Sequence, residues 1–228
     1  MTAPRNFLGT EGFPLPDLLE KATHVWDLLK TLGPWCKTHV KKTRIQGRVS
    51  RSAVIEGLVI IGKGTVVEAG AYLRGPIMIG RDCDIRHNAY LRGEVVVGDG
   101  SVIGNSCELK HTICGAEVQV PHLAYVGDTV LGRKVHLGAG VIVSNVKLNR
   151  GNIQVTVDGA AYDTQLKKFG AVVGDLTEVG CNCVLNPGTL LGPECLMYPN
   201  VSWSGFLPAR HIVKYRPEYQ VIPRRSII

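Results

Sequence analysis

Three cations recur along the chain at one fixed interval. The run A-Y-L-R-G occurs twice and an E-L-K run follows it, at positions that make Arg74, Arg92 and Lys110 equally spaced. If that interval of about 18 residues makes one turn of a repeating structure, these side chains lie on one face, about 4.8 Å apart. Guanidinium and ammonium groups at that spacing can hold a phosphate, although like charges on neighbouring strands also repel. The interval predicts either an anion site or a solvated ladder that Glu94 and Glu108 partly neutralise.

A histidine, a phenol and an amide follow the ladder. His122 belongs to the corner after Val120 that turns onto the face of the cations. Tyr125 is expected on that face one coil beyond Lys110, and Asn145 one coil further. An imidazole titrates near neutrality and is the usual general base, but a lone histidine at a corner is more often a structural hydrogen-bonding group. The convergence of a base, a phenol, an amide and two cations favours a functional site.

A six-residue repeat must position these groups. Every sixth residue is aliphatic over Ile61–Leu109, and after two five-residue steps the count continues over Val126–Val143 and resumes over Val173–Met197. Neither an α-helix nor a half-buried strand has a period of six, whereas a β-helix does. Small residues precede the aliphatic position, and glycine often follows it, as tight corners require. We therefore predict an all-β fold, a single-stranded parallel β-helix with three hexads per triangular coil.

The repeat also divides the chain. We predict an N-terminal arm and helix, a β-helix domain with one excursion from the coil, and a C-terminal tail, over residues 1–44, 45–205 (excursion 147–171) and 206–228. Residues 1–14 indicate a loose arm, and a helix is expected from Leu15 to about Leu32, ended by Gly33 and Pro34. Its apolar face would cover the open first coil or contact a partner subunit. An excursion from a rigid repeat is a usual place for function.

Composition limits the partners and the compartment. The 228 residues carry a net charge of +7, from 26 Lys and Arg against 19 Asp and Glu, but the cations are dispersed, which fits small anionic substrates better than nucleic acid. The seven cysteines form no C-x-x-C pair and are typical of packed free thiols in a reducing compartment. No apolar run reaches the ~18 residues of a membrane span, and no signal-peptide pattern opens the chain. We expect a cytoplasmic protein that binds neither nucleic acid nor membrane.

The residues around His122 resemble a known family. The run H-L-A-Y-V-G-D from His122, followed by L-G-A-G from Leu137 and by Asn145, is similar to the acetyltransferase half of the GlmU family of bifunctional UDP-N-acetylglucosamine enzymes. The run from Asp163 to Asp175 resembles archaeal sugar-1-phosphate nucleotidylyltransferases that carry the same C-terminal domain. The resemblance covers roughly residues 54–205 and implies that the β-helix is left-handed.

The resemblance also implies a reaction. In that family an acetyl group moves from acetyl-CoA to the 2-amine of glucosamine 1-phosphate, and the enzyme is a homotrimer. By resemblance His122 is the general base, and the substrate ligands are Arg92, Lys110 and Tyr125 for the sugar phosphate, Asn145 for the sugar, and Lys168 beyond the excursion. Acetyl-CoA is expected at the C-terminal coils, with Cys181, Pro199 and Lys214 as contacts and Arg216, Arg224 and Arg225 as further cations for its phosphates.

Some positions depart from the family pattern. Val146 replaces a tyrosine, His136 stands where the family has asparagine, and Pro121 precedes the histidine. No G-x-G-T-R-M-type nucleotide loop occurs, so we expect this chain to have no pyrophosphorylase activity and a separate nucleotidyltransferase to be a candidate partner. Two alternatives stay open. One is a catalytically silent trimeric scaffold for such a partner. The other is a γ-carbonic-anhydrase-like metalloenzyme, because His87 and His122 share a corner type two coils apart.

Overall fold

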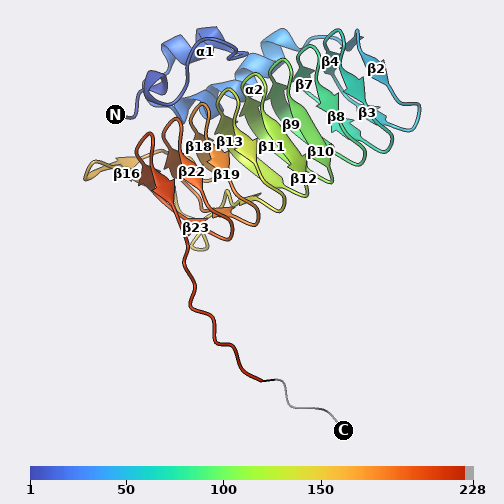
Figure 1. Cartoon of the computed structure of the whole chain (residues 1–228). Helices are drawn as coiled ribbons and strands as arrows, with labels where there is room; N and C mark the ends of the chain where they lie inside the picture. The colour runs from blue at the N-terminus through green and yellow to red at the C-terminus, as the bar shows by residue number, and fades with distance from the viewer. Residues whose placement is uncertain (224–228) are drawn as a thin grey trace.

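The computed structural model describes residues 1–223, which form a parallel β-helix with three faces (Figure 1). Face 1 consists of β3 (Val54–Glu56), β6 (Tyr72–Arg74), the first halves of β9 (Tyr90–Val97), β11 (Glu108–Cys114) and β13 (Tyr125–Leu131), then β15 (Ile142–Val143), β20 (Val184–Leu185) and β23 (Ser202–Trp203). Face 2 consists of β1 (Arg44–Ile45), β4 (Val59–Ile61), β7 (Ile77–Ile79), the second halves of β9, β11 and β13, then β18 (Ala171–Val173), β21 (Thr189–Leu191) and β24 (Phe206–Leu207). Face 3 is a nine-stranded sheet of β2 (Arg48–Val49), β5 (Val66–Val67), β8 (Asp84–Ile85), β10 (Val102–Asn105), β12 (Gln119–His122), β14 (His136–Leu137), β19 (Glu178–Val179), β22 (Leu196–Met197) and β25 (Ile212–Val213).

The aliphatic hexad positions fill the interior of the coils. On face 1, Leu91, Leu109 and Val126 are paired in register on adjacent strands, and each is fully buried. Faces 2 and 3 contribute equivalent columns to the same core. Each strand thus buries one side chain per hexad and stacks it on the equivalent residue of the next coil. The predicted fold class, a left-handed parallel β-helix with an N-terminal helical segment and a C-terminal tail, is confirmed.

The corner between faces 1 and 2 shortens along the chain. In β9 two residues turn this corner, Gly93 and Glu94, with φ of 50° and 48°. In β11 and β13 a single residue turns it, His111 with φ 48° and Asp128 with φ 49°. A one-residue corner demands the left-handed conformation, which non-glycine residues adopt at a cost. The corner therefore holds the backbones of His111 and Asp128 in conformations that are set by the coil.

The N-terminal segment covers face 2. It contains a short 3-10 helix η1 (Pro4–Asn6) and the helices α1 (Pro16–Lys21) and α2 (Asp27–His39), which lie along one side of the coils in Figure 1. The outward side chains of face 2 are themselves aliphatic, and they form a second buried cluster with this segment, which includes Val96, Ile113, Val130, Val172 and Leu190. The expectation that a helix caps the open first coil is wrong, because the helices cover this lateral apolar stripe instead, and its burial stabilises the fold.

Two further expectations for the N-terminal segment are corrected. Residues 1–14 do not form a loose arm: Phe7 and Leu8 are buried, and the Phe7 ring lies 6.2 Å from the Phe206 ring. The single predicted helix is interrupted at residues 22–26, and the second helix runs through Pro34 to His39. Proline inside a helix costs about 3 kcal/mol, but α2 buries Leu28, Leu29, Leu32 and Cys36 on one face. That burial keeps the helix intact past the proline.

Residues 147–170 leave the coil, as the break in the hexads predicts. They include an antiparallel hairpin of β16 (Gln154–Val157) and β17 (Ala160–Asp163). Ile153, Val155 and Val157 are buried in the same cluster as the N-terminal helices, and the ring centres of Tyr162 and Trp26 lie 5.9 Å apart. The hairpin is therefore packed on the body of the protein.

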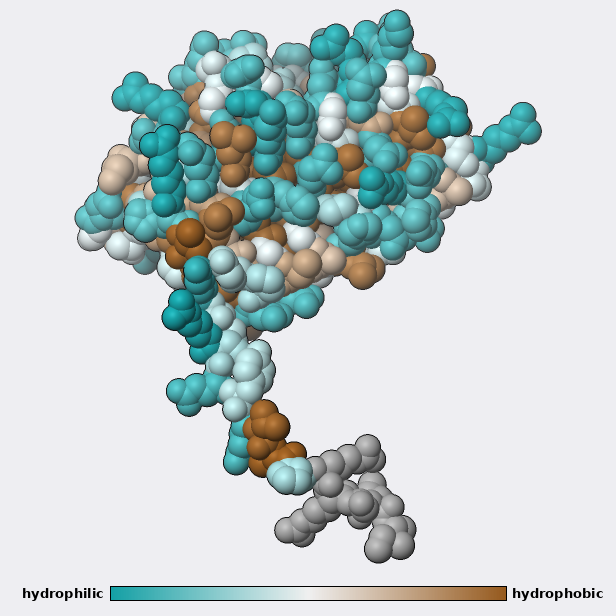
Figure 2. All heavy atoms as spheres, viewed as in Figure 1, coloured by the Kyte–Doolittle hydropathy of each residue, from teal (hydrophilic) through white to brown (hydrophobic). Residues whose placement is uncertain are grey.

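The coils extend beyond residue 205, where we expected the tail to begin. Both β24 and β25 pair with the preceding coil, and the chain then leaves the body as an extended segment (Figure 1). Hydrophilic residues dominate the surface seen from this side, with apolar residues scattered among them (Figure 2). Neither helix of residues 1–223 has the length and hydropathy needed to cross a bilayer.

Candidate functional site

Arg74, Arg92 and Lys110, the cation ladder, lie on one face, as their fixed interval in the sequence predicts. Arg74 pairs in register with Arg92, and Arg92 with Lys110, on three adjacent strands of face 1. Each cation has a carboxylate partner, at Arg74 Nε–Glu56 Oε1 3.5 Å, Arg92 Nε–Glu108 Oε1 2.7 Å and Lys110 Nζ–Asp128 Oδ2 2.9 Å. The hydrogen bond to Glu108 raises the pKa of the Arg92 guanidinium. Of the two carboxylates expected to neutralise the ladder, Glu108 does so and Glu94 forms no ion pair within residues 1–223. The charges of the ladder are therefore partly balanced by carboxylates, but each cation keeps further N–H groups that can bind an anion.

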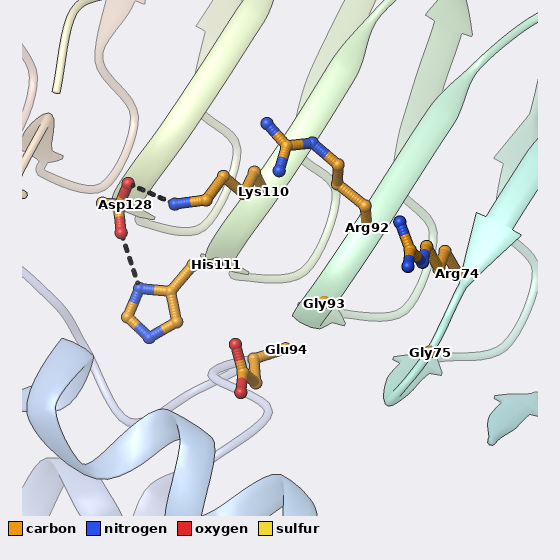
Figure 3. A pocket seen from close by; sticks show the side chains of 8 residues that line it. All are labelled: Arg74, Gly75, Arg92, Gly93, Glu94, Lys110, His111 and Asp128. Carbon is orange, nitrogen blue, oxygen red and sulfur yellow. Dashed lines mark hydrogen bonds and ion pairs between the residues drawn. The ribbon is translucent and has the colours of Figure 1, made fainter. Parts of the chain in front are cut away.

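A cavity of about 400 Å³ runs alongside this ladder, at the corner between faces 1 and 2. Figure 3 shows the side chains of Arg74, Arg92 and Lys110 projecting from neighbouring strands, with His111 and Glu94 on the side of the N-terminal helices. A Cβ placed on Gly33 of α2 would lie 3.4 Å from Glu94 Oε1, so the helix borders the cavity. The cavity combines a row of N–H donors with a histidine, which suits a small phosphorylated ligand.

Asp128 is the buried centre of the network beside the cavity. Its side chain is 6% exposed, and it accepts hydrogen bonds from Lys110 Nζ at 2.9 Å, from His111 Nδ1 at 3.1 Å and from Asn145 Nδ2. Burial by itself raises the pKa of this carboxyl, but the bonds from His111, Lys110 and Asn145 outweigh burial and hold the pKa below its ordinary value. Asp128 is therefore a carboxylate at neutral pH, and it fixes three side chains.

Tyr125 and Asn145 extend the site along face 1. Asn145 Nδ2 lies 3.3 Å from the Tyr125 hydroxyl, and both side chains are half-buried. They cross above Gly127, where an added Cβ would lie 2.6 Å from Tyr125 Oη and 2.8 Å from Asn145 Nδ2. Gly127 thus leaves the space in which the phenol and the amide meet. The structure brings together Arg92, Lys110, Tyr125 and Asn145, as the sequence predicts.

His122 lies at a different edge of face 1. It ends β12 on face 3, opposite Asn105 of β10, and its side chain is exposed and makes no hydrogen bond to residues 1–223. Face 1 resumes at Tyr125, three residues later. The histidine therefore stands at the corner between faces 3 and 1, across face 1 from the cavity, with its ring free.

Lys168 ends the excursion next to the same network. Its side chain is exposed, and the residues after it are bound to the site through the backbone, at Phe169 N–Asn145 O 3.0 Å and Gly170 N–Asp128 O 2.8 Å. The excursion therefore returns to the coil directly beside Asn145 and Asp128.

The residues expected to contact acetyl-CoA border a groove at the C-terminal end of the coils. The groove has a volume of about 400 Å³ and is lined by residues that include His136, Cys181, Tyr198 and Pro199. Lys214 Nζ lies 4.7 Å above the centre of the Tyr198 ring, which places its charge at the same edge. Cys181 is exposed, whereas the other six cysteines are buried free thiols. Arg216 lies in the extended tail, and Arg224 and Arg225 lie outside the described residues.

Sequence reasoning missed His111 and Asp128 as parts of the site. The two five-residue steps in the hexad count were the available signal, because a step of five removes one corner residue. After the first of these steps the turn is one residue shorter, so Lys110 pairs with Gly127. Asp128 then follows at the next corner, where its carboxylate reaches Lys110. Within residues 1–223, no group of three or more His, Cys, Asp or Glu side chains is arranged to hold a metal ion.

Comparison with known proteins identifies the family. The GMPPB C-terminal domain family matches residues 73–191, which include the ladder, His122, Asn145 and Lys168. The chain belongs to this family.

Curated relatives agree with the resemblance seen in the sequence. The bifunctional protein GlmU of Methanococcus aeolicus is 34% identical over 191 residues, which cover 80% of this chain and 45% of the relative. The bifunctional sugar-1-phosphate nucleotidylyltransferase/acetyltransferase of Sulfurisphaera tokodaii is 32% identical over 174 residues, 76% of this chain and 43% of the relative. The chain spans about half the length of these relatives. The Escherichia coli K12 protein YaiX, which is named as an acetyltransferase, is 32% identical over 184 residues and 79% of each chain is covered.

Proposed function

We propose that this protein is an acetyl-CoA-dependent N-acetyltransferase whose acceptor is an amino-sugar 1-phosphate such as glucosamine 1-phosphate. The observation that carries the proposal is the meeting of Arg92, Lys110, Tyr125 and Asn145 on face 1, next to an H-L-x-Y-x-G-D motif. The relatives of M. aeolicus and S. tokodaii, named as a GlmU protein and as a nucleotidylyltransferase/acetyltransferase, support the same class of reaction.

The acceptor's phosphate would bind against Arg92 and Lys110. Charge-assisted bonds to a phosphate are worth roughly 1.5–3 kcal/mol each, and both cations retain N–H donors beyond their bond to a carboxylate. Tyr125 and Asn145 would then contact the sugar ring, and the exposed Lys168 would close the site from the excursion.

The chemical step requires a base. An amine attacks a thioester through its lone pair, so the acceptor's ammonium group first loses one proton to solvent. As the neutral nitrogen bonds to the carbonyl carbon, the imidazole of His122 would take a second proton from it. The tetrahedral intermediate collapses with cleavage of the C–S bond, and the imidazolium returns the proton to the departing thiolate of coenzyme A. The products are the N-acetylated sugar phosphate and coenzyme A. The groove beside Cys181, Pro199 and Lys214 would hold the acetyl-CoA.

The proposed assembly is a homotrimer. The aliphatic outer side of face 2 cannot drive it, because the N-terminal helices of the same chain cover that side. The position of His122 supports it instead, since the histidine is exposed at the edge of face 1 that is remote from the cavity, where a neighbouring subunit could complete the site. Light scattering at micromolar concentration should give three times the chain mass, and a monomer mass would contradict the assembly.

Kinetics of three variants test the roles. His122→Ala should lower kcat by roughly 10²–10⁴-fold with little change in the KM for the sugar phosphate. Arg92→Ala and Lys110→Ala should raise that KM by about one to two decades, because they bind a group that is present in ground and transition states alike. If folded wild-type protein is inert towards every amino-sugar phosphate, the scaffold alternative, a silent partner of a separate nucleotidyltransferase, replaces this proposal.

A further inference from the structure

We propose that Asp128 is the positioning residue of the acceptor site, which aligns Lys110 and Asn145 for the amino-sugar phosphate while leaving the phosphate contact itself to the cations. The inference rests on the proposed function. Of the side chains of the H-L-x-Y-x-G-D motif, only His122 and Tyr125 act in the proposed reaction, and the aspartate that ends the motif is Asp128.

The contacts of Asp128 connect three successive coils. Oδ2 accepts from Lys110 Nζ of β11, one coil earlier, and from Asn145 Nδ2, which follows β15 one coil later. Oδ1 accepts from His111 Nδ1 at 3.1 Å, so His111 presents this nitrogen as an N–H donor. Two side chains that would contact the acceptor therefore take their positions from one carboxylate.

The backbone of Asp128 fixes the excursion as well. Its carbonyl oxygen accepts from Gly170 N at 2.8 Å, two residues after Lys168. Its φ of 49° is set by the one-residue corner, so its backbone cannot adjust without moving the coil. Asp128 thus ties Lys110, Asn145 and the segment that carries Lys168 to a single rigid point.

The charge of Asp128 opposes phosphate binding, and this gives the proposal a distinctive signature. A carboxylate bonded to Lys110 Nζ repels a phosphate that approaches the same ammonium. Replacing Asp128 with asparagine should therefore leave binding of inorganic phosphate unchanged or make it tighter, by up to about ten-fold. Acetyl transfer should still suffer, because Lys110 and Asn145 lose their alignment. A residue that only stabilised the coil would affect both measurements in the same direction.

The test compares Asp128→Asn with Asp99→Asn as a control. Asp99 is another corner aspartate whose carboxylate binds a cation: it accepts from the Arg81 guanidinium at 2.8 Å and from the Arg81 backbone N–H at 2.7 Å. It lies at the corner between faces 2 and 3, away from the acceptor site. Steady-state kinetics measure kcat/KM for the amino-sugar phosphate, calorimetry measures the Kd of inorganic phosphate, and thermal unfolding checks the fold.

We expect Asp128→Asn to lower kcat/KM for the acceptor about ten- to hundred-fold, with the KM for acetyl-CoA and the phosphate Kd no worse than wild type. Asp99→Asn should leave all three unchanged. Unchanged acceptor kinetics in a folded Asp128→Asn protein would overturn the proposal, and so would weaker phosphate binding. If the wild type transfers no acetyl group, the proposed function fails separately. The Kd of inorganic phosphate then tests the location of Asp128 by itself. Tighter phosphate binding in Asp128→Asn than in wild type supports a location beside the anion site, and weaker binding contradicts it.

Discussion

A single added methyl group at Gly127 should disable the site without unfolding the protein. A Cβ at this position would lie 2.6 Å from Tyr125 Oη and 2.8 Å from Asn145 Nδ2, whereas ordinary contacts begin at 3.4 Å. The phenol must therefore move by about 0.8 Å, and displacements of about 1 Å in a positioned group cost up to about 10²-fold in rate. Gly127 is not among the residues at positive φ, so alanine fits its backbone. We expect Gly127→Ala to lower kcat/KM for the amino-sugar phosphate by about ten- to hundred-fold.

Stability should change little, because the displaced atoms are the ends of half-buried side chains. We expect a loss of less than about 1 kcal/mol in the free energy of unfolding. The assay measures thiol release from acetyl-CoA, alongside thermal unfolding. Gly151→Ala is the control, since a Cβ there would make only ordinary contacts with the Asn149 side chain, at 3.5 Å and beyond, and should be neutral in both measurements. Wild-type kcat/KM in Gly127→Ala would refute the placement of Tyr125 and Asn145 in the site.

Three further outcomes follow from the core, the buried carboxylate and the groove. Leu109→Ala should cost about 2–5 kcal/mol of unfolding free energy in chemical denaturation, because Leu109 is fully buried, whereas Leu148→Ala at a fully exposed position should be neutral. Asp128 has a pKa below its ordinary value in the folded protein, so its stabilising effect is complete above about pH 4 and is lost as the pH falls through the folded pKa. The free energy of unfolding should therefore fall more steeply below about pH 4 in wild type than in Asp128→Asn. Parallel acid unfolding curves would contradict this. Lys214→Ala should raise the KM for acetyl-CoA about three- to ten-fold and leave the KM for the acceptor unchanged, because the ammonium lies 4.7 Å from the centre of the Tyr198 ring at the edge of the groove. Equal changes in the KM of both substrates would argue against a contact with acetyl-CoA.

The β-helix could be predicted because each six-residue repeat specifies its own strand and corner. Each hexad contributes one buried aliphatic side chain, so the spacing of Leu91, Leu109 and Val126 is enough to mark the register of three coils. The same register places Arg74, Arg92 and Lys110 on one face. The period of the repeat determines which residues share a face, and it therefore predicts the cation ladder.

The parts that prediction missed depend on contacts between distant segments. The outward aliphatic stripe of face 2 attracts the N-terminal segment, which is why α2 continues through Pro34 and why Phe7 is buried. The local sequence shows Pro34, which disfavours a helix, but it does not show the apolar surface of face 2 whose burial offsets that cost. His111 and Asp128 were missed for a related reason, since one deleted corner residue changes which side chains meet across coils. In the structure Lys110 pairs with Asp128 of the next coil and not with Glu94.

The central claim, that face 1 binds a phosphorylated amino sugar for acetyl transfer, is tested most directly with a matched pair of acceptors. Wild-type protein is supplied with acetyl-CoA and either glucosamine 1-phosphate or glucose 1-phosphate, which differ at the 2-position, and both thiol release and the mass of the sugar product are measured. The proposed function predicts thiol release coupled one-to-one to an acetylated product with the amino sugar, and none with glucose 1-phosphate. Folded protein that releases no thiol with the amino sugar, or that releases it equally with both sugars, would contradict the claim.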